Sequence, residues 1–328
     1  MPTLRLSLRA CLCAFAGAAL LAAHAPQARA ADAWPSRTIH FVIPFTAGGA
    51  NDMLGRAAAE GAARVLGQSI VVDNKPGSGT VVGTAFVARS APDGYTFLIS
   101  SAGVVSNGMI RTVPYQDDQL VPVAMIGLAP SVVVVPASSP YHTLKEFVQA
   151  SRESPRGFHW STAGVGSTPH FVQGWLATEY GAKLDLVPYK SGAESITAVL
   201  SAQVDATSEA SIVVLPYIKE GKLRALADTW TQRISAYPDL PTAAEQGFPA
   251  VQIAHWAGVH APAGTPPEIL DKMAAAIDTA MKDPATAARL KGMGIEPIGG
   301  TRASFAKFID EERARLGAVV KATGMKAE

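Results

Sequence analysis

The sequence is poor in cysteine and in clustered charge. It contains two cysteines, Cys11 and Cys13, and both lie within the first 30 residues. The rest of the chain therefore has no disulfide framework, so packing has to stabilise it. The whole sequence has 28 Lys and Arg against 27 Asp and Glu, and no basic stripe interleaved with aromatic residues occurs in it. This composition argues against nucleic acid and anionic membranes as partners.

Several catalytic and nucleotide-binding signatures are also missing. The chain has no phosphate loop with its lysine, no G-x-S-x-G elbow and no H-E-x-x-H zinc motif. Ser167 and His170 lie close together in sequence, but no carboxylate can be assigned to complete a relay. We therefore expect no enzyme, no metal and no cofactor, and keep a periplasmic hydrolase only as an alternative.

The first 30 residues have the pattern of a secretory signal peptide. Arg5 and Arg9 precede an apolar run, 10–23, and the small residues Ala28 and Ala30 predict cleavage after Ala30. The run is shorter than the roughly 20 residues that span a bilayer, so it predicts a cleaved signal rather than an anchor. We expect the mature chain to be soluble and periplasmic.

Beyond the signal, apolar runs alternate with helical segments, which predicts an α/β fold with largely parallel sheets. The expected strands are 38–43, 69–74, 95–100, 131–136, 158–162, 183–189, 203–208, 223–228 and 254–261. Helices are expected at 52–67, 143–153, 169–181 and 192–202, and the C-terminal part, from about 265 on, is expected to be mainly helical.

The chain from residue 31 on reaches the roughly 250 to 300 residues at which single cores tend to split, so we expect two domains. The pattern of the sequence changes near 113–127 and again near 223–242. We therefore predict a discontinuous domain 1, residues 31–122 plus 228–328, and an inserted domain 2, residues 123–227. The ligand cleft would lie between them.

A loop with two adjacent glycines follows the first strand, in "PFTAGGAND". Glycine allows positive φ and close approach of a ligand to the backbone. Unpaired N–H groups before a helix make an anion site, although a plain turn is equally compatible with the spacing. Asn51 or Asp52 is expected to cap the helix. The candidate ligand contacts here are Thr46, Ala47, Gly48, Gly49, Asn51 and Asp52.

A second loop of the same kind lies in "STAGVGSTPH", residues 161–170, which begins with the last two residues of the strand at 158–162. A helix is expected to begin near Thr168 or Pro169, since proline suits a first helical turn. A third small residue is missing after Gly166, so the loop is no dinucleotide fingerprint. His170 also fits a simple packing role. The candidate contacts here are Ser161, Thr162, Ala163, Gly164, Gly166, Ser167, Thr168 and His170.

Two further loops carry weaker signals. Ser101 and Ala102 follow the strand at 95–100 and are compatible with a polar turn as well as with ligand contact. Tyr189 ends the strand expected at 183–189 and Lys190 follows it, and Lys190 is equally typical of a solvated surface lysine. The glycines of "NKPGSGTVVG" lack a third small residue and are interpreted as structural.

The ordered set of segments "WPSRTIHFVIPFTAGGANDMLGR", "LGQSIVVDNKPGSGTVVG", "APDGYTFLIS", "VPYK", "EGKLRALA", "PAGTPPEIL" and "GIEPIGGT" resembles the substrate-binding proteins of tripartite tricarboxylate transporters, the Bug receptors. The resemblance implies a two-domain Venus-flytrap receptor. It implies a small carboxylate as ligand, a two-component membrane permease as partner and a monomer. It also implies that backbone N–H groups hold the carboxylate, at Ala47, Gly48, Gly49, Ser161, Thr162, Ala163, Gly164, Gly166 and Ser167.

One position departs from the pattern of the resembled family. Where many members have an apolar residue and an Asp-Asn pair, this chain has Ser208, Glu209 and Ala210. Our hypothesis is that Glu209 reaches the cleft and accepts a hydrogen bond from a ligand amine or hydroxyl; a capping or surface role is the alternative. A periplasmic sensor, or a receptor for another transporter type, remains a second functional alternative.

Overall fold

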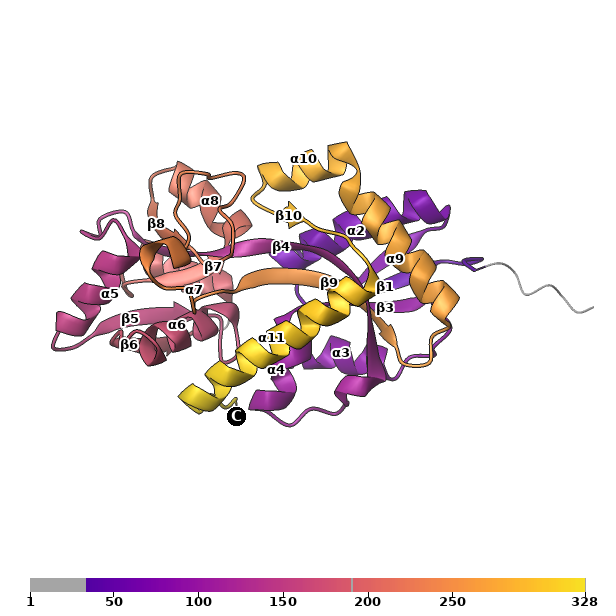
Figure 1. Cartoon of the computed structure of the whole chain (residues 1–328), viewed down its shortest axis with the longest axis horizontal. Coiled ribbons are helices and arrows are strands. Elements are labelled where there is room, and N and C mark those ends of the chain that lie inside the picture. The colour runs from indigo at the N-terminus through magenta and orange to yellow at the C-terminus, as the bar shows by residue number, and fades with distance from the viewer. Residues whose placement is uncertain (1–33, 190, 328) are drawn as a thin grey trace, which may run out of the picture. The chain divides into compact units, whose positions relative to one another are not determined.

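The computed structural model describes residues 34–189 and 191–327 (Figure 1). The predicted signal peptide, its cleavage site after Ala30 and the candidate residue Lys190 lie outside the described residues. The chain from Arg37 on forms one compact unit. None of the described helices is long and apolar enough to cross a membrane.

A parallel three-stranded unit begins the fold. Strand β1 lies between β2 and β3 and pairs in parallel with both. Its side chains are almost entirely buried, as expected for the middle strand of a sheet covered on both faces. The elements of this part are β1 (Ile39–Ile43), α2 (Ala50–Leu66), β2 (Ile70–Asn74), α3 (Val81–Ala88), β3 (Thr96–Ser100) and α4 (Ala102–Ile110).

Two long strands, β4 (Leu120–Pro136) and β9 (Ala254–Pro262), extend this sheet and run through the middle of the unit (Figure 1). They pair antiparallel with each other, and every antiparallel pair of the structure involves one of them. The first part of β4 pairs with β9 and the last part with β7 and β8. These strands therefore connect the two parts of the fold.

The second part of the fold packs around the last residues of β4. Strands β5 and β6 pair in parallel, and Trp160 of β5 forms a parallel bridge to Ala206, just before β7. The elements are α5 (Leu144–Glu153), β5 (Phe158–Thr162), α6 (Thr168–Thr178), β6 (Leu184–Pro188), α7 (Gly192–Leu200), β7 (Thr207–Ala210), α8 (Ser211–Lys219) and β8 (Leu223–Asp228).

The C-terminal segment is mainly helical, as predicted. Helix α9 packs on α2, and the long helix α11 contacts both α4 and α6, so it lies across the two parts (Figure 1). Its Phe305 packs with Trp256 of β9 in the main core. The elements are α9 (Pro267–Lys282), α10 (Pro284–Gly292), β10 (Glu296–Pro297) and α11 (Arg302–Thr323).

The predicted α/β class is confirmed, and a strand is found at or beside each of the nine expected positions. Three helices, α3, α4 and α8, were not predicted. The strand expected at 131–136 is part of the much longer β4, so the predicted domain boundary at 122/123 falls inside a continuous strand. The division into domains stays a prediction.

Candidate functional site

The carboxyl ends of β1, β2 and β3 meet along one edge, which we call edge 1, because parallel strands point the same way. The first predicted loop leaves this edge after Ile43, and Ser101 follows directly after Ser100. Loops at the carboxyl ends of strands are where open α/β sheets bind ligands. The structure therefore brings the first and third predicted loops to one edge.

Gly48 is the turning point of the first loop. Its φ is +91°, and a Cβ there would meet no atom within 4 Å, so the loop borders open space. Among the described residues, the N–H groups of Ala47 and Gly49 have no acceptor. The N–H of Gly48 donates to Asp52 Oδ2 at 2.9 Å. Two backbone donors of this loop are thus available to an anion.

Asp52 hydrogen-bonds to the first loop, at Gly48, and does not cap the N-terminus of α2. Its buried carboxylate accepts hydrogen bonds from Arg56 Nε at 2.9 Å, from Asn74 Nδ2 at 2.8 Å and from Gly48. Burial alone would raise the pKa of Asp52, but these hydrogen bonds hold it below its ordinary value. The carboxylate is therefore ionised and fully engaged within the protein.

The predicted cap of α2 by Asn51 or Asp52 is wrong. The N-cap residue is Gly49, which makes no side-chain hydrogen bond. The Asn51 amide instead donates to the carbonyl of Trp256 on β9, at 2.8 Å. A capping side chain has to precede the first helical residue, and here the helix already begins at Ala50.

Ser101 caps α4, where the sequence was compatible with a simple turn. Its Oγ accepts from the N–H of Gly103 at 3.4 Å, and Ala102 is the first helical residue. The helix then runs to Ile110. Ser101 is therefore the N-cap residue of a helix that begins at edge 1, and its hydroxyl oxygen accepts a hydrogen bond from the helix backbone.

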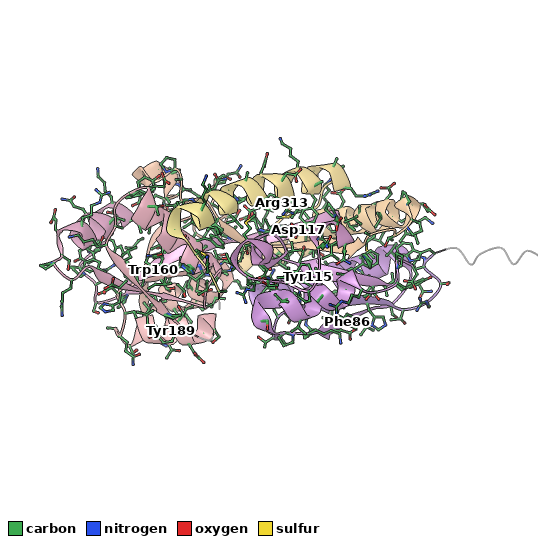
Figure 2. All side chains as sticks on the ribbon, turned by 90° about the horizontal axis from the view of Figure 1, so that it is seen from below. Phe86, Tyr115, Asp117, Trp160, Tyr189 and Arg313 are labelled. Carbon is green, nitrogen blue, oxygen red and sulfur yellow. The ribbon has the colours of Figure 1, made fainter. Side chains whose placement is uncertain are left out.

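The carboxyl ends of β5, β6 and β7 form a second edge, which we call edge 2. The N–H of Tyr189 donates to the carbonyl of Thr162 at 2.8 Å, so the chain after β6 lies beside the end of β5. The Thr207 hydroxyl donates to the carbonyl of Ser161 at 2.8 Å. Edge 2 thus brings together the second loop, Tyr189 and Glu209. Figure 2 shows Tyr189 in the same part of the fold as Trp160.

The second loop is shaped by two glycines with positive φ, Gly164 at +100° and Gly166 at +79°. As predicted, α6 begins at Thr168, with Pro169 in its first turn. The N–H groups of Gly164 and Gly166 make long bonds, to Thr162 Oγ1 at 3.2 Å and to His170 Nδ1 at 3.3 Å. Such long bonds are readily exchanged for a stronger acceptor. The N–H of Ala163 has no acceptor among the described residues.

His170 and Ser167 do not form a catalytic pair. The Ser167 hydroxyl donates to the carbonyl of Gly164 at 2.7 Å, and His170 Nδ1 accepts from Gly166. Burial lowers the pKa of His170 to about 4, so its ring is neutral near pH 7. Each of the two side chains makes a hydrogen bond to the backbone of the loop. Among the described residues, no cluster of three His, Cys, Asp or Glu is placed to hold a metal.

Contacts at the C-terminal end of α4 tie the second loop to the first part of the fold. The Arg111 guanidinium donates to the carbonyls of Ser78 and Val165, each at 3.3 Å. Ile110 packs so close that a Cβ on Gly166 would lie 2.3 Å from its Cδ1. Sequence reasoning missed Arg111, because a single arginine after a polar segment carries no local signal.

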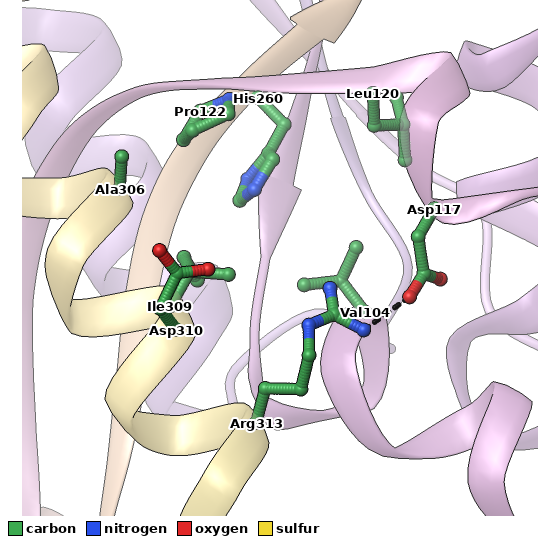
Figure 3. A pocket seen from close by; sticks show the side chains of 9 residues that line it. All are labelled: Val104, Asp117, Leu120, Pro122, His260, Ala306, Ile309, Asp310 and Arg313. Carbon is green, nitrogen blue, oxygen red and sulfur yellow. Dashed lines mark hydrogen bonds and ion pairs between the residues drawn. The ribbon is translucent and has the colours of Figure 1, made fainter.

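A cavity of about 160 Å³ lies elsewhere, between α4, α11, β4 and β9 (Figure 3). Its wall includes His260 and the ion pair of Arg313 with Asp117. His260 Nδ1 lies 2.7 Å from Ser100 Oγ, and burial lowers the pKa of this histidine to about 3. None of the predicted site residues lines this cavity.

Residues 54–325 match the family of tripartite tricarboxylate transporter family receptors. The chain belongs to this family. BugT of Bordetella pertussis is 33% identical over 300 residues, which cover 90% of this chain and 92% of BugT. The family consists of receptors, not enzymes, so the hydrolase alternative is rejected.

Solved structures of tripartite tricarboxylate transporter receptors and other binding proteins share the fold. A protein of R. palustris with adipate has a TM-score of 0.81 at 31% identity and covers 89% of this chain and 99% of its own. MatC from Rhodopseudomonas palustris with bound malate has a TM-score of 0.77 at 28% identity, and covers 88% of this chain and 100% of its own. The two-domain periplasmic binding protein fold and the family resemblance are thereby confirmed.

Proposed function

We propose that this protein is a periplasmic receptor that captures a small carboxylate between edge 1 and edge 2 and delivers it to a tripartite tricarboxylate permease. The observation that carries the proposal is the pair of glycine turns at the ends of parallel strands, with N–H groups of Ala47, Gly49 and Ala163 that have no acceptor among the described residues. The relatives that contain adipate and malate support the class of ligand.

In this proposal, backbone donors hold the carboxylate and no buried cation is needed. A receptor built in this way leaves no unpaired buried cation when it is empty. Charge-assisted hydrogen bonds contribute about 1.5 to 3 kcal/mol each, so three or four of them, less the ordering costs, reach micromolar affinity. Closure over the ligand then signals occupancy to the permease, and the receptor acts as a monomer after cleavage of its signal peptide at Ala30.

A thermal-shift screen of the mature protein against a panel of mono-, di- and tricarboxylates tests the proposal. A ligand at 100 times its Kd adds about 2.7 kcal/mol of stability and should raise the melting temperature by several degrees. The matched control is the fully amidated, uncharged form of each acid that produces a shift, which should produce none. The absence of a shift with every acid would contradict the proposal.

A further inference from the structure

Glu209 is a buried carboxylate, and none of the described residues places a cation beside it. It lies in β7 opposite Val132 of β4, and its side chain is on the face that α7 covers. Only 6% of the residue is exposed, and Oε1 has no hydrogen-bond partner among the described residues. Leaving such an acceptor unpaired is costly, so a ligand that offers a hydrogen-bond donor at this place is favoured.

The Glu209 carboxylate packs directly against Gly192, the first residue of α7. A Cβ on Gly192 would lie 2.7 Å from Glu209 Oε1 and 3.2 Å from Oε2, so a larger residue would displace the carboxylate. The first turn of α7, which Ser191 caps, favours a negative charge at this place. The helix therefore supports the ionised form but does not supply a counter-charge.

A hydrogen-bonded network connects this position to the second loop. Ser195 Oγ of α7 lies 2.8 Å from Ser161 Oγ and 3.1 Å from Thr207 Oγ1. Thr207 in turn donates to the carbonyl of Ser161. Glu209 lies two residues further along β7, on the same face as Thr207, so its side chain shares this face with the network that reaches Ser161.

The buried Glu209 carboxylate restricts which group a ligand can carry in addition to the carboxylate that the loops hold. A second carboxylate next to ionised Glu209 would be repelled, whereas an ammonium group would pair with it. Resting on the function proposed above, we propose that the cargo is an amino acid or a similar zwitterion, whose ammonium group donates to Glu209 while the loops hold its carboxylate.

The proposal fixes the sign of the pH dependence. Burial raises the pKa of Glu209 to about 7, against the opposing effect of a hydrogen bond from the Ala210 N–H. An ammonium ligand needs the ionised form, so its affinity should increase about tenfold from pH 6 to pH 8. A dicarboxylate that required protonated Glu209 would show the opposite trend.

Other titratable groups on the elements around β7 have to be separated from Glu209. Asp228 lies across Val132 on the same face of the sheet, and burial raises its pKa to about 7 as well. The pKa of His170 lies near 4, outside the window. The remaining groups on α7, α8 and β5 are Glu194, Tyr217, Lys219 and His159. Asp228 is therefore the control that matters most.

Isothermal titration of the mature protein with matched acids tests the inference. The pairs are aspartate and succinate, glutamate and glutarate, and 4-aminobutyrate and butyrate, each measured at pH 6, 7 and 8. We expect one amino acid to bind at least tenfold more tightly than its partner without the amine. Glu209→Gln should abolish this preference and the pH dependence while carboxylates still bind, and Asp228→Asn should retain both.

A second variant covers the possibility that Glu209→Gln does not fold, which far-UV circular dichroism would show. Gly192→Ala keeps the charge but places a methyl group against it, and should reduce the preference for the amine. The inference is overturned, and the receptor function kept, if acids bind without such a preference or if both variants leave it unchanged. Failure of every acid to bind would overturn both.

Discussion

Gly164 and Gly166 are both needed in the second loop, but for different reasons. Both have positive φ, which side chains with a Cβ rarely adopt. A Cβ on Gly164 would lie 3.8 Å from the nearest atom, the carbonyl oxygen of Tyr189. A Cβ on Gly166 would lie within 2.3 Å of Ile110. Gly166 is thus the point where the loop packs against α4.

We predict that Gly166→Ala destabilises the protein more than Gly181→Ala does. Both glycines have positive φ, at +79° and +62°, but a Cβ on Gly181 would meet no atom within 4 Å. The backbone strain is therefore shared, and the clash with Ile110 adds about 1 to 3 kcal/mol. Urea unfolding of the two variants measures the difference. Equal midpoints would show that α4 yields without cost.

The elements that the sequence predicted are those whose signal is local. Contiguous apolar runs identify the strands of both edges, and a loop of small residues between strand and helix identifies both glycine turns. Helix α8 was missed because it contains Pro216, and α4 because glycine, serine and asparagine interrupt its pattern. The part of β4 that pairs with β9 contains Pro122 and Pro130, and it becomes a strand through this pairing with a segment far along the chain.

For the candidate site, too, the sequence predicted the features that have a local signal. Glycine turns can be read from a local pattern, so both loops were found. The contact of Glu209 with Gly192 joins residues on different elements, and so does that of Ile110 with Gly166. Such contacts depend on tertiary packing, and no periodicity in the sequence reveals them. The predicted cap by Asn51 failed because the helix already begins at Ala50, and the Asn51 amide instead finds its partner on β9.

We predict that Asp52→Asn loosens the first loop and lowers stability at neutral pH. The substitution replaces charge-assisted hydrogen bonds by neutral ones, a loss of about 1 to 2 kcal/mol. Because the folded pKa of Asp52 is depressed, its contribution is present above the unfolded pKa and is lost as pH falls through the folded value. Urea midpoints of variant and wild type should therefore differ at pH 7 and converge near pH 2.

Glu60→Gln is the matched control for this prediction. Glu60 lies on the same helix and also pairs with arginines, but its side chain is 53% exposed, so solvent screens those pairs. Its removal should change the midpoint only slightly. A larger effect from Glu60 than from Asp52 would contradict the role assigned to the buried carboxylate.

At the scale of the whole molecule, β4 and β9 connect the parts that carry edge 1 and edge 2, and α11 packs on both (Figure 1). Two antiparallel strands can bend while their hydrogen bonds are kept, and the register of this pair shifts at two places, 122–124 and 125–127. Such irregularities bend a sheet locally. The crossing is therefore the place where we expect any closing motion to be absorbed.

We predict that a bound carboxylate shifts the distance between the two parts of the molecule. The two cysteines of the chain, Cys11 and Cys13, lie in the predicted signal peptide, so a protein that begins at residue 31 can be spin-labelled at introduced cysteines without background. Glu268→Cys on α9 and Lys219→Cys on α8 place exposed labels on the two sides of the crossing. Double electron–electron resonance should show one distance distribution without ligand and a displaced one at saturation, because hinge closure moves whole domains.

The control pair, Glu268→Cys with Val65→Cys, reports a distance within the first part, where α9 packs on α2, and this distance should not change. Binding that leaves both distributions unchanged would mean that the receptor presents its cargo without closing, and the permease would then have to recognise the ligand itself.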